Sequence, residues 1–305
     1  MPELDLDRLR ELRAREPDAI AAAAAARRRR PLLRGDGRLL LIAADHPARG
    51  VLGVGSRAMA MADRGELLRR LVTALERPGV DGVLGTPDVI DDLLLLGVLD
   101  DKVVIGSMNR GGLQGARFEI DDRFTGYDAA TIATMGFEGG KMLCRIDLDD
   151  HATPATLAAC AEAVSSLAAR GLLAMVEPFL SRRVHGQLRN DLSADAVVRA
   201  VAIASGLGAS SARTWLKLPV VDDMERVMAA TTLPTLLLGG DPTTAPEQTY
   251  ARWDKALALP GVRGLVVGRA LLYPPDDDVA AAVDVAAALT HPEADDGGRL
   301  DAAHG

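Results

Sequence analysis

The sequence predicts a single (β/α)8 barrel, an α/β fold of eight parallel strands, preceded by an N-terminal helical arm. Short apolar runs of strand length alternate with longer segments of helical periodicity, and eight such units follow one another. The chain of 305 residues is long enough for one barrel domain of this kind. The turn after the first expected strand contains Gly50, Gly53 and Gly55, which do not have the GxGxxG spacing, and this disfavours an open doubly wound sheet.

Residues 1–34 are expected to form the helical arm. The alanine run at 21–26 favours a helix, and the arginines at 27–30 suit its C-terminus before Pro31 ends it. A basic run can bind nucleic acid, but the surrounding charge is acidic, so we expect an outer helix that closes the bottom of the barrel. The barrel domain should span residues 35–290 and be followed by a disordered tail at 291–305.

The apolar runs predict where the strands lie. They are expected at residues 38–44, 81–85, 102–107, 141–147, 172–177, 213–218, 234–239 and 263–268. Helices are expected between them, for example at residues 64–76, 154–170, 193–205, 222–231, 247–258 and 277–289. Capping residues such as Ser193 and the Thr153-Pro154 pair open several of these helices.

The composition is that of a globular chain with a packed core, with 48% hydrophobic and 26% charged residues. The formal net charge of −8 argues against non-specific binding to nucleic acid or to a membrane surface. Cys144 and Cys160 form no CxxC pair, so reduced thiols are expected. The N-terminus lacks the features of a signal peptide, and no apolar run approaches the length of a membrane span, so we expect a cytoplasmic protein.

Lys217 is the most informative polar residue in the expected strands. The chain has only four lysines, at 102, 141, 217 and 255, and otherwise uses arginine as its cation. Arginine stays charged, whereas a lysine buried in an apolar strand can lose its proton. Burial near other cations lowers a lysine pKa from its free value of about 10.4, and the neutral amine can attack a carbonyl to form an imine. Asp45 and Glu177 each end an otherwise apolar strand at the same mouth and could transfer the protons.

Glycines in the loops after the seventh and eighth strands suit an anion. Each of the pairs Gly239-Gly240 and Gly268-Arg269 leads towards a helix, whose backbone N–H groups could hold a phosphate. The loops after these two strands form the usual phosphate site of barrels. We therefore predict phosphate contacts from these four residues. Further cations near the ends of the fourth and fifth strands are expected to contact the substrate, namely Arg145, Arg183 and its neighbour Arg182.

Several segments together resemble the class I (Schiff-base) aldolases of the barrel type, roughly over residues 38–275: LLLIAADHPARG, KMLCRIDLDD, MVEPFL, TWLKLPV, LLLGGD and GLVVGRALLYP. The resemblance is nearest to the lineage of archaeal-type fructose-bisphosphate, tagatose-bisphosphate and sulfofructose-phosphate aldolases. It implies imine chemistry at Lys217, a catalytic aspartate at Asp45 and phosphate contacts from the glycine pairs.

The fifth strand departs from the archaeal fructose-bisphosphate enzymes, which have a tyrosine before the proline. This chain has Glu177 there and is similar to the tagatose type, which also has a fourth-strand lysine that matches Lys141. The resemblance thus supports Glu177 and adds Lys141 to the expected catalytic residues. Lys141 is expected at the start of its strand, deeper in the barrel than the mouth.

The leading hypothesis is a class I aldolase of carbohydrate metabolism, a carbon–carbon lyase that cleaves a phosphorylated ketose or keto sugar acid. By analogy, one specific candidate is the 2-deoxy-5-keto-gluconate-6-phosphate aldolase of inositol breakdown. A lysine imine needs no cofactor and no metal ion, and neither is expected. The expected partners are a small phosphorylated sugar, as substrate, and further copies of the chain in a homo-oligomer. Two alternatives stay open. His46, His151 and His185 could serve a metal-dependent lyase or hydrolase, although no HxH or HExxH spacing is present, or the chain could be a non-enzymatic regulator on an aldolase scaffold.

Overall fold

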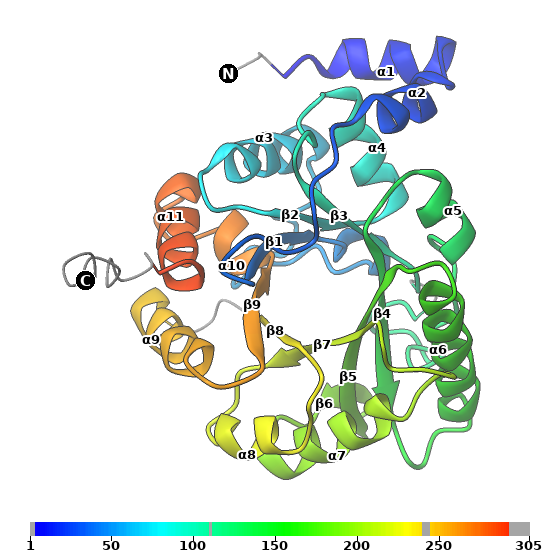
Figure 1. Cartoon of the computed structure of the whole chain (residues 1–305), viewed down its shortest axis with the longest axis vertical. Helices are drawn as coiled ribbons and strands as arrows, with labels where there is room; N and C mark the ends of the chain where they lie inside the picture. The colour runs from blue at the N-terminus through cyan, green and yellow to red at the C-terminus, as the bar shows by residue number, and fades with distance from the viewer. Residues whose placement is uncertain (1–3, 110–111, 240–244, 293–305) are drawn as a thin grey trace, which may run out of the picture.

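A closed barrel of parallel strands forms the centre of the computed structural model, which describes residues 4–109, 112–239 and 245–292 (Figure 1). Within these residues, eight strands form a ring in the order β4-β3-β2-β1-β9-β8-β7-β5, and β4 pairs with β5 to close it. The predicted (β/α)8 barrel is therefore confirmed. The strands of the ring are β1 (Leu39–Ala44), β2 (Gly82–Gly85), β3 (Val103–Ser107), β4 (Gly139–Ile146), β5 (Leu173–Val184), β7 (Thr214–Pro219), β8 (Thr235–Leu238) and β9 (Val262–Val267).

The strand residues divide between two apolar cores. In β1, Leu39 and Leu41 belong to the cluster that fills the barrel, whereas Leu40 and Ile42 pack under the surrounding helices. Successive side chains of a strand point to opposite faces, and both faces of a barrel strand are covered. This is why all six residues of β1 are buried, and why the sequence shows continuous apolar runs instead of an alternating pattern.

Helices follow the strands and cover the outside of the barrel (Figure 1). Ser193 caps one of them as expected, because its side chain accepts a hydrogen bond from the N–H of Ala196. Thr153 is not a cap but the first helical residue, and its hydroxyl donates to the carbonyl of Asp147 at 2.6 Å. The helices after β1 are η1 (Pro47–Arg49), α3 (Arg64–Glu76), α4 (Pro87–Leu95), α5 (Ala129–Thr134), α6 (Thr153–Ala168), α7 (Ala194–Ser205), α8 (Met224–Ala229), α9 (Pro246–Leu257), α10 (Arg269–Leu272) and α11 (Val279–Thr290).

The N-terminal arm consists of α1 (Leu6–Arg15) and α2 (Ala19–Ala26), and α2 packs against α4. The arginine run that follows α2 binds carboxylates that lie just before strands. Arg27 Nη2 lies 3.1 Å from Glu138 Oε1, one residue before β4, and Arg30 Nη1 lies 2.5 Å from Asp81 Oδ1, one residue before β2. These are buried ion pairs at the N-terminal ends of the strands. The run therefore attaches the arm to the bottom of the barrel.

The expected tail begins with a residue that the fold holds in place. His291 follows α11 directly, its Nε2 atom lies 3.0 Å from Asp81 Oδ2, and its Nδ1 atom contacts Asp36. The remainder of the expected tail, from residue 293, lies outside the described residues. Among the helices that the structure describes, none has both the length and the apolar character that a bilayer crossing requires.

A β-hairpin that the sequence analysis did not predict extends from the fifth strand of the ring. β5 continues to Val184 and pairs antiparallel with β6 (Gln187–Asn190). The turn residues His185 and Gly186 both have positive φ, 50° and 78°, as a type I′ turn requires. Residues 178–184 therefore form a strand and not the expected loop.

Candidate active site

A cavity of about 630 Å³ opens at the C-terminal ends of the barrel strands. Its charged lining residues are Asp45, Arg49, Glu119, Lys141, Arg145, Glu177, Arg189, Lys217, Arg252 and Arg269. Seven of these ten are cations and three are anions, although the chain as a whole has a formal charge of −8. The local excess of positive charge makes the cavity suitable for an anionic small molecule.

Glu177 joins two buried lysines at the base of this cavity. Its Oε1 atom lies 3.1 Å from Lys217 Nζ, and its Oε2 atom forms an ion pair with Lys141. Lys141 Nζ also donates a hydrogen bond of 3.1 Å to Asp45 Oδ2. The side chains of these four residues are between 2% and 11% exposed. The sequence therefore identified four residues that the fold brings into contact as a buried chain of alternating charge.

The position of Lys141 differs from the expected one. β4 begins at Gly139, so Lys141 is its third residue, and in the sheet Lys141 is paired with Ser107, the last residue of β3. Strands in a closed barrel are staggered along the axis, which places an early residue of one strand level with the end of its neighbour. Lys141 thus reaches the same level as Asp45 and Glu177, and the expectation that it lies deeper than the mouth was wrong.

Asp45 has further polar neighbours at the end of β1. The hydroxyl of Ser107 donates to Asp45 Oδ2 at 3.4 Å, and His46 Nδ1 lies 3.7 Å from Asp45 Oδ1. Burial lowers the pKa of His46 well below its usual value, and the positive charges of Arg269 and Lys217 lower it further. At neutral pH this histidine is therefore an uncharged imidazole that lines the cavity.

The expected phosphate residues lie on the side of the cavity formed by β8 and β9. Gly239, Gly268 and Arg269 all line it. A Cβ atom at Gly268 would lie 2.3 Å from the carbonyl oxygen of Ala43, so a residue with a side chain does not fit there. Gly268 also precedes the short helix α10, and the Arg269 guanidinium donates to the carbonyl of Gly53 at 3.5 Å. Gly240, the remaining predicted contact, lies outside the described residues.

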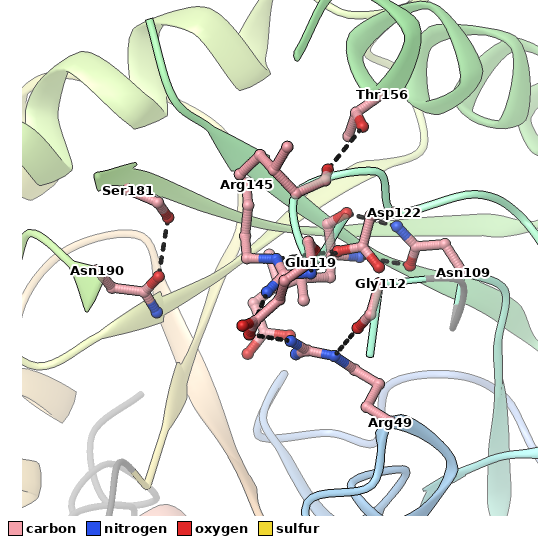
Figure 2. Close-up of polar contacts among 12 residues, drawn as sticks. Arg49, Asn109, Gly112, Glu119, Asp122, Arg145, Thr156, Ser181 and Asn190 are labelled. Carbon is pink, nitrogen blue, oxygen red and sulfur yellow. Dashed lines mark hydrogen bonds and ion pairs between the residues drawn. The ribbon is translucent and has the colours of Figure 1, made fainter. Parts of the chain in front are cut away.

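Arg145 lines the cavity, but carboxylates of the protein bind its guanidinium (Figure 2). Arg145 Nη1 lies 3.0 Å from Glu119 Oε1, and Arg145 Nε donates to Asp122 Oδ2 at 3.1 Å. Both acidic residues belong to the segment that connects β3 to α5. Arg49 approaches the same Glu119 oxygen at 3.6 Å. Arg145 therefore anchors this segment, which revises the expectation that its charge contacts the substrate.

Arg183 does not line the cavity. It lies in the β5–β6 hairpin, where its guanidinium donates to the carbonyl of Arg117 at 2.7 Å and lies 3.7 Å from Asp150. The expectation that Arg183 contacts the substrate assumed a loop after residue 177. In the observed hairpin the residues that reach the cavity are instead Arg189 and Asn190, on β6.

Sequence reasoning missed seven polar residues among those described that line the cavity, namely Arg49, Gln114, Glu119, Thr249, Arg252, Arg189 and Asn190. The hairpin that carries the last two had a signal, since His185-Gly186 stands between two runs of strand character. Arg49 follows the first strand closely, which also places it at the mouth. Glu119 lies in a long connection without periodicity, and the sequence contains no comparable signal for it.

The three histidines of the metal alternative do not converge. His46 lines the cavity, whereas His151 and His185 are not among its lining residues. Within the described part of the chain, no group of three or more histidine, cysteine, aspartate or glutamate side chains is arranged to hold a metal ion. Cys144 and Cys160 are buried free thiols.

Solved structures of aldolases share this fold at low identity. A Schiff-base-forming fructose-1,6-bisphosphate aldolase is 18% identical, with a TM-score of 0.61, and the match covers 89% of this chain and 99% of that one. The fructose-bisphosphate aldolase of Slackia heliotrinireducens is 16% identical, with a TM-score of 0.61 and coverage of 94% and 92%. A comparison with curated proteins finds no match.

A much nearer likeness identifies the family. Cgl0159 of Corynebacterium glutamicum, whose crystal structure is known, is 59% identical to this chain, with a TM-score of 0.92. That match covers 94% of this chain and 96% of the other. The family described as Cgl0159-like matches residues 37–287, which include every barrel strand and every residue of the cavity. The chain belongs to the Cgl0159-like family.

Proposed function

We propose that this protein is a class I aldolase that cleaves a phosphorylated ketose or keto sugar acid through an imine on Lys217. The observation that supports this best is the contact between Lys217 and Glu177, buried beneath a cationic cavity. An amine that must react with a carbonyl needs a nearby group that can accept and return protons, and Glu177 is at hydrogen-bond distance. The aldolase fold of the low-identity neighbours is consistent with this chemistry.

The two lysines have different surroundings. Lys141 contacts both Asp45 and Glu177, and two carboxylates stabilise an ammonium ion strongly. Lys217 contacts Glu177, whose carboxylate can take its proton. We therefore assign Lys217 as the nucleophile and Lys141 as a fixed positive charge that holds the two carboxylates in place.

The proposed reaction uses these groups in sequence. The Lys217 nitrogen attacks the substrate carbonyl, and the carbinolamine loses water with a proton from Glu177 to give an iminium ion. A carboxylate then removes the proton of the hydroxyl two carbons away from the iminium carbon. The carbon–carbon bond breaks, its electron pair moves into the enamine, and an aldehyde leaves. Protonation of the enamine carbon and hydrolysis of the imine release the ketone product and restore the lysine.

The glycines and Arg269 support a phosphate at one end of the substrate. Gly239 and Gly268 line the cavity, and the lack of a side chain would let their backbone approach a phosphate closely. Arg269 adds a positive charge beside them. A ketose phosphate that is cleaved in this way gives dihydroxyacetone phosphate as the ketone. A substrate such as 2-deoxy-5-keto-gluconate 6-phosphate would satisfy the same requirements and is our specific candidate, by family analogy.

Borohydride trapping tests the proposal without knowledge of the aldehyde partner. The protein is incubated with dihydroxyacetone phosphate and sodium borohydride, digested, and mapped by mass spectrometry. We expect a covalent adduct on the peptide that contains Lys217. Lys217→Arg should keep the fold and lose the adduct, because arginine does not deprotonate. Lys255→Arg, at an exposed position on α9, is the matched control and should keep it.

The same experiment separates the alternatives. The metal-dependent alternative would be supported if wild-type protein gives no adduct and its activity is abolished by a chelator and restored by a divalent metal ion. The hypothesis of a non-enzymatic regulator would be supported if wild-type protein gives no adduct and cleaves no phosphorylated sugar.

A further inference from the structure

His46 is a partly buried side chain at the mouth of the cavity that the proposed reaction does not use. It follows Asp45 directly after β1, and it lines the cavity. Its backbone carbonyl accepts hydrogen bonds from the N–H groups of Arg49 and Val51, at 3.1 Å and 3.3 Å. Its ring packs against Gly268, since a Cβ atom added there would lie 3.3 Å from His46 Cε1. The backbone and the ring of this histidine are therefore both held in place beside the phosphate residues.

The two ring nitrogens of His46 have different surroundings. Nδ1 is buried, lies 3.7 Å from Asp45 Oδ1, and has no hydrogen-bond partner among the described residues. The side chain as a whole is nevertheless 27% exposed. With Nδ1 buried and Cε1 against Gly268, the ring edge that carries Nε2 is the one that faces the cavity. The nearby carboxylate favours the tautomer with its proton on Nδ1, so Nε2 presents a lone pair to a ligand.

The carboxylates near this imidazole already bind ammonium groups. Asp45 Oδ2 accepts a hydrogen bond from Lys141 Nζ at 3.1 Å, and Glu177 contacts both Lys141 and Lys217. A cation next to a carboxylate favours its ionised form and makes it a weaker base. His46 has no such partner on Nε2 among the described residues, and the ring is uncharged at neutral pH because burial above all lowers its pKa. It is therefore a further group at the mouth that can accept a proton.

His46 and Glu177 approach the cavity from opposite walls. β1 and β5 are four places apart in the ring of eight strands and so lie across the barrel from each other (Figure 1). Glu177 reaches the Lys217 nitrogen from β5, and His46 stands at the end of β1, against Gly268. A ketone phosphate whose phosphate lies at Gly268 and whose carbonyl carbon is bonded to Lys217 would therefore have its carbons beside the imidazole.

We propose that His46 is the catalytic group that removes and returns the proton at the enamine carbon. In the iminium of dihydroxyacetone phosphate, Nε2 takes a proton from the hydroxymethyl carbon. The electron pair of that C–H bond forms the double bond of the enamine, and the iminium nitrogen becomes neutral. The reverse step is the protonation that follows carbon–carbon cleavage, for which the imidazole takes its proton from solvent in the cavity. This inference rests on the proposed function and leaves Glu177 to the steps at the lysine nitrogen.

Substrate binding would strengthen this base. After burial, the positive charge of Arg269 is the next cause that lowers the pKa of His46. A phosphate bound to Arg269 offsets that charge, and Asp45 lies close enough to Nδ1 to stabilise the imidazolium that forms. The imidazole is therefore a better proton acceptor when the ligand is in place.

Hydrogen exchange in dihydroxyacetone phosphate tests His46 separately from the imine. The compound is incubated with the protein in D2O, proton NMR follows the loss of hydrogen from the hydroxymethyl carbon, and borohydride trapping at Lys217 is measured in parallel. We expect wild-type protein to exchange only one of the two hydrogens on that carbon, because a single base acts on one face. His46→Gln should keep the adduct and slow the exchange by about 100-fold or more, because an amide cannot take up the proton. His151→Gln, at an exposed position outside the cavity, is the matched control and should exchange as wild type does.

The two measurements distinguish failure of this inference from failure of the proposed function. Absence of an adduct in wild-type protein would overturn the proposed function itself, and the role of His46 with it. An adduct without exchange in wild-type protein, exchange of both hydrogens, or exchange at the wild-type rate in His46→Gln would overturn the role of His46 and leave the imine in place. Loss of the adduct in His46→Gln would assign His46 to imine formation and so also overturn its role at the enamine carbon.

Discussion

The Oε1 atom of Glu177 lies 3.1 Å from the Nζ atom of Lys217, while the other oxygen of the same carboxylate binds Lys141. One negative charge is thus shared between two buried amines. A second carboxylate, Asp45, also contacts Lys141, so two amines and two carboxylates are in contact at the base of the cavity. Because these four groups interact, substitution of one residue changes the protonation equilibria of the others. The effect can be measured on activity or on stability.

Glu177→Gln keeps the shape of the side chain and removes its ability to move protons. We expect kcat for carbon–carbon cleavage to fall by about 100-fold to 10,000-fold, with little change in KM, because the residues proposed to bind the phosphate lie elsewhere in the cavity. Steady-state kinetics of the retro-aldol reaction measures this. Glu162→Gln, at an exposed position of α6, should behave as wild type. An unchanged kcat in Glu177→Gln would remove Glu177 from the mechanism.

Lys141→Met removes the cation that contacts both carboxylates. Two buried negative charges then lose a counter-ion, so we expect a loss of about 3–5 kcal/mol in the free energy of unfolding at pH 7. Protonation of the carboxylates would relieve the repulsion, so the deficit should shrink as the pH falls. Urea denaturation at pH 7 and pH 5 measures both effects, with Lys255→Met as the exposed control. A deficit independent of pH would mean that lost packing, and not charge, dominates.

Arg269→Ala should weaken binding of a phosphorylated substrate. We expect KM to rise by about 10-fold to 100-fold, with a smaller change in kcat, because a charge-assisted contact to phosphate is lost. The substitution should also raise the pKa of His46, since Arg269 is one of the charges that lower it. The pKa should stay below the usual value, because burial is the larger cause and remains. NMR titration of the histidine measures this shift, and an unchanged pKa would contradict the placement of Arg269 beside the imidazole.

His291 should make stability depend on pH at the bottom of the barrel. Hydrogen bonding to Asp81 raises the pKa of His291 above its usual value, and hydrogen bonding to Asp36 adds to this. A raised pKa in the folded state means that the stabilisation is complete below about pH 6.5, the unfolded value, and is lost as the pH rises through the folded value. We expect His291→Gln to lower the free energy of unfolding by about 1 kcal/mol at pH 6 and by less at pH 9.

Urea denaturation of wild-type protein and His291→Gln at both pH values provides the check. Titration of Asp81 and Asp36 does not contribute to the difference between pH 6 and pH 9, because the pKa of each carboxyl is lowered. Burial would raise each of these pKa values, but hydrogen bonds, from His291 among others, outweigh it. Both carboxylates therefore stay ionised over this range. A difference between the two proteins that grows from pH 6 to pH 9 would show that His291 acts in its neutral form.

The barrel could be predicted from the sequence because its strands are buried on both faces. Such strands appear as continuous apolar runs, and all eight were located to within a few residues at their starts. Lys217 was identified for a related reason, since a single lysine within a buried apolar strand is unusual and indicates a chemical role. Lys141 was misplaced because the stagger between β3 and β4 is a property of the closed ring and not of either strand alone.

The hairpin residues were missed because of where the fifth strand was ended. Proline is uncommon inside a strand, so the fifth strand was expected to end before Pro178. β5 instead continues past Pro178 and pairs with β6. Arg182 and Arg183 were therefore expected to reach the substrate, whereas the I′ turn returns the chain along β6, and residues of β6 line the cavity instead. Glu119 depends on a long-range ion pair with Arg145, which local patterns do not reveal.

β5 runs without a break from Leu173 to Val184, so the floor of the cavity at Glu177 and the first half of the hairpin are parts of one strand. The second half is attached to it only through the backbone ladder and the two-residue turn. A substitution of a side chain in β6 therefore does not require Glu177 to move. Under the proposed function, substitutions at residues 188–190 would alter the rim of the cavity while the contact between Lys217 and Glu177 stays in place.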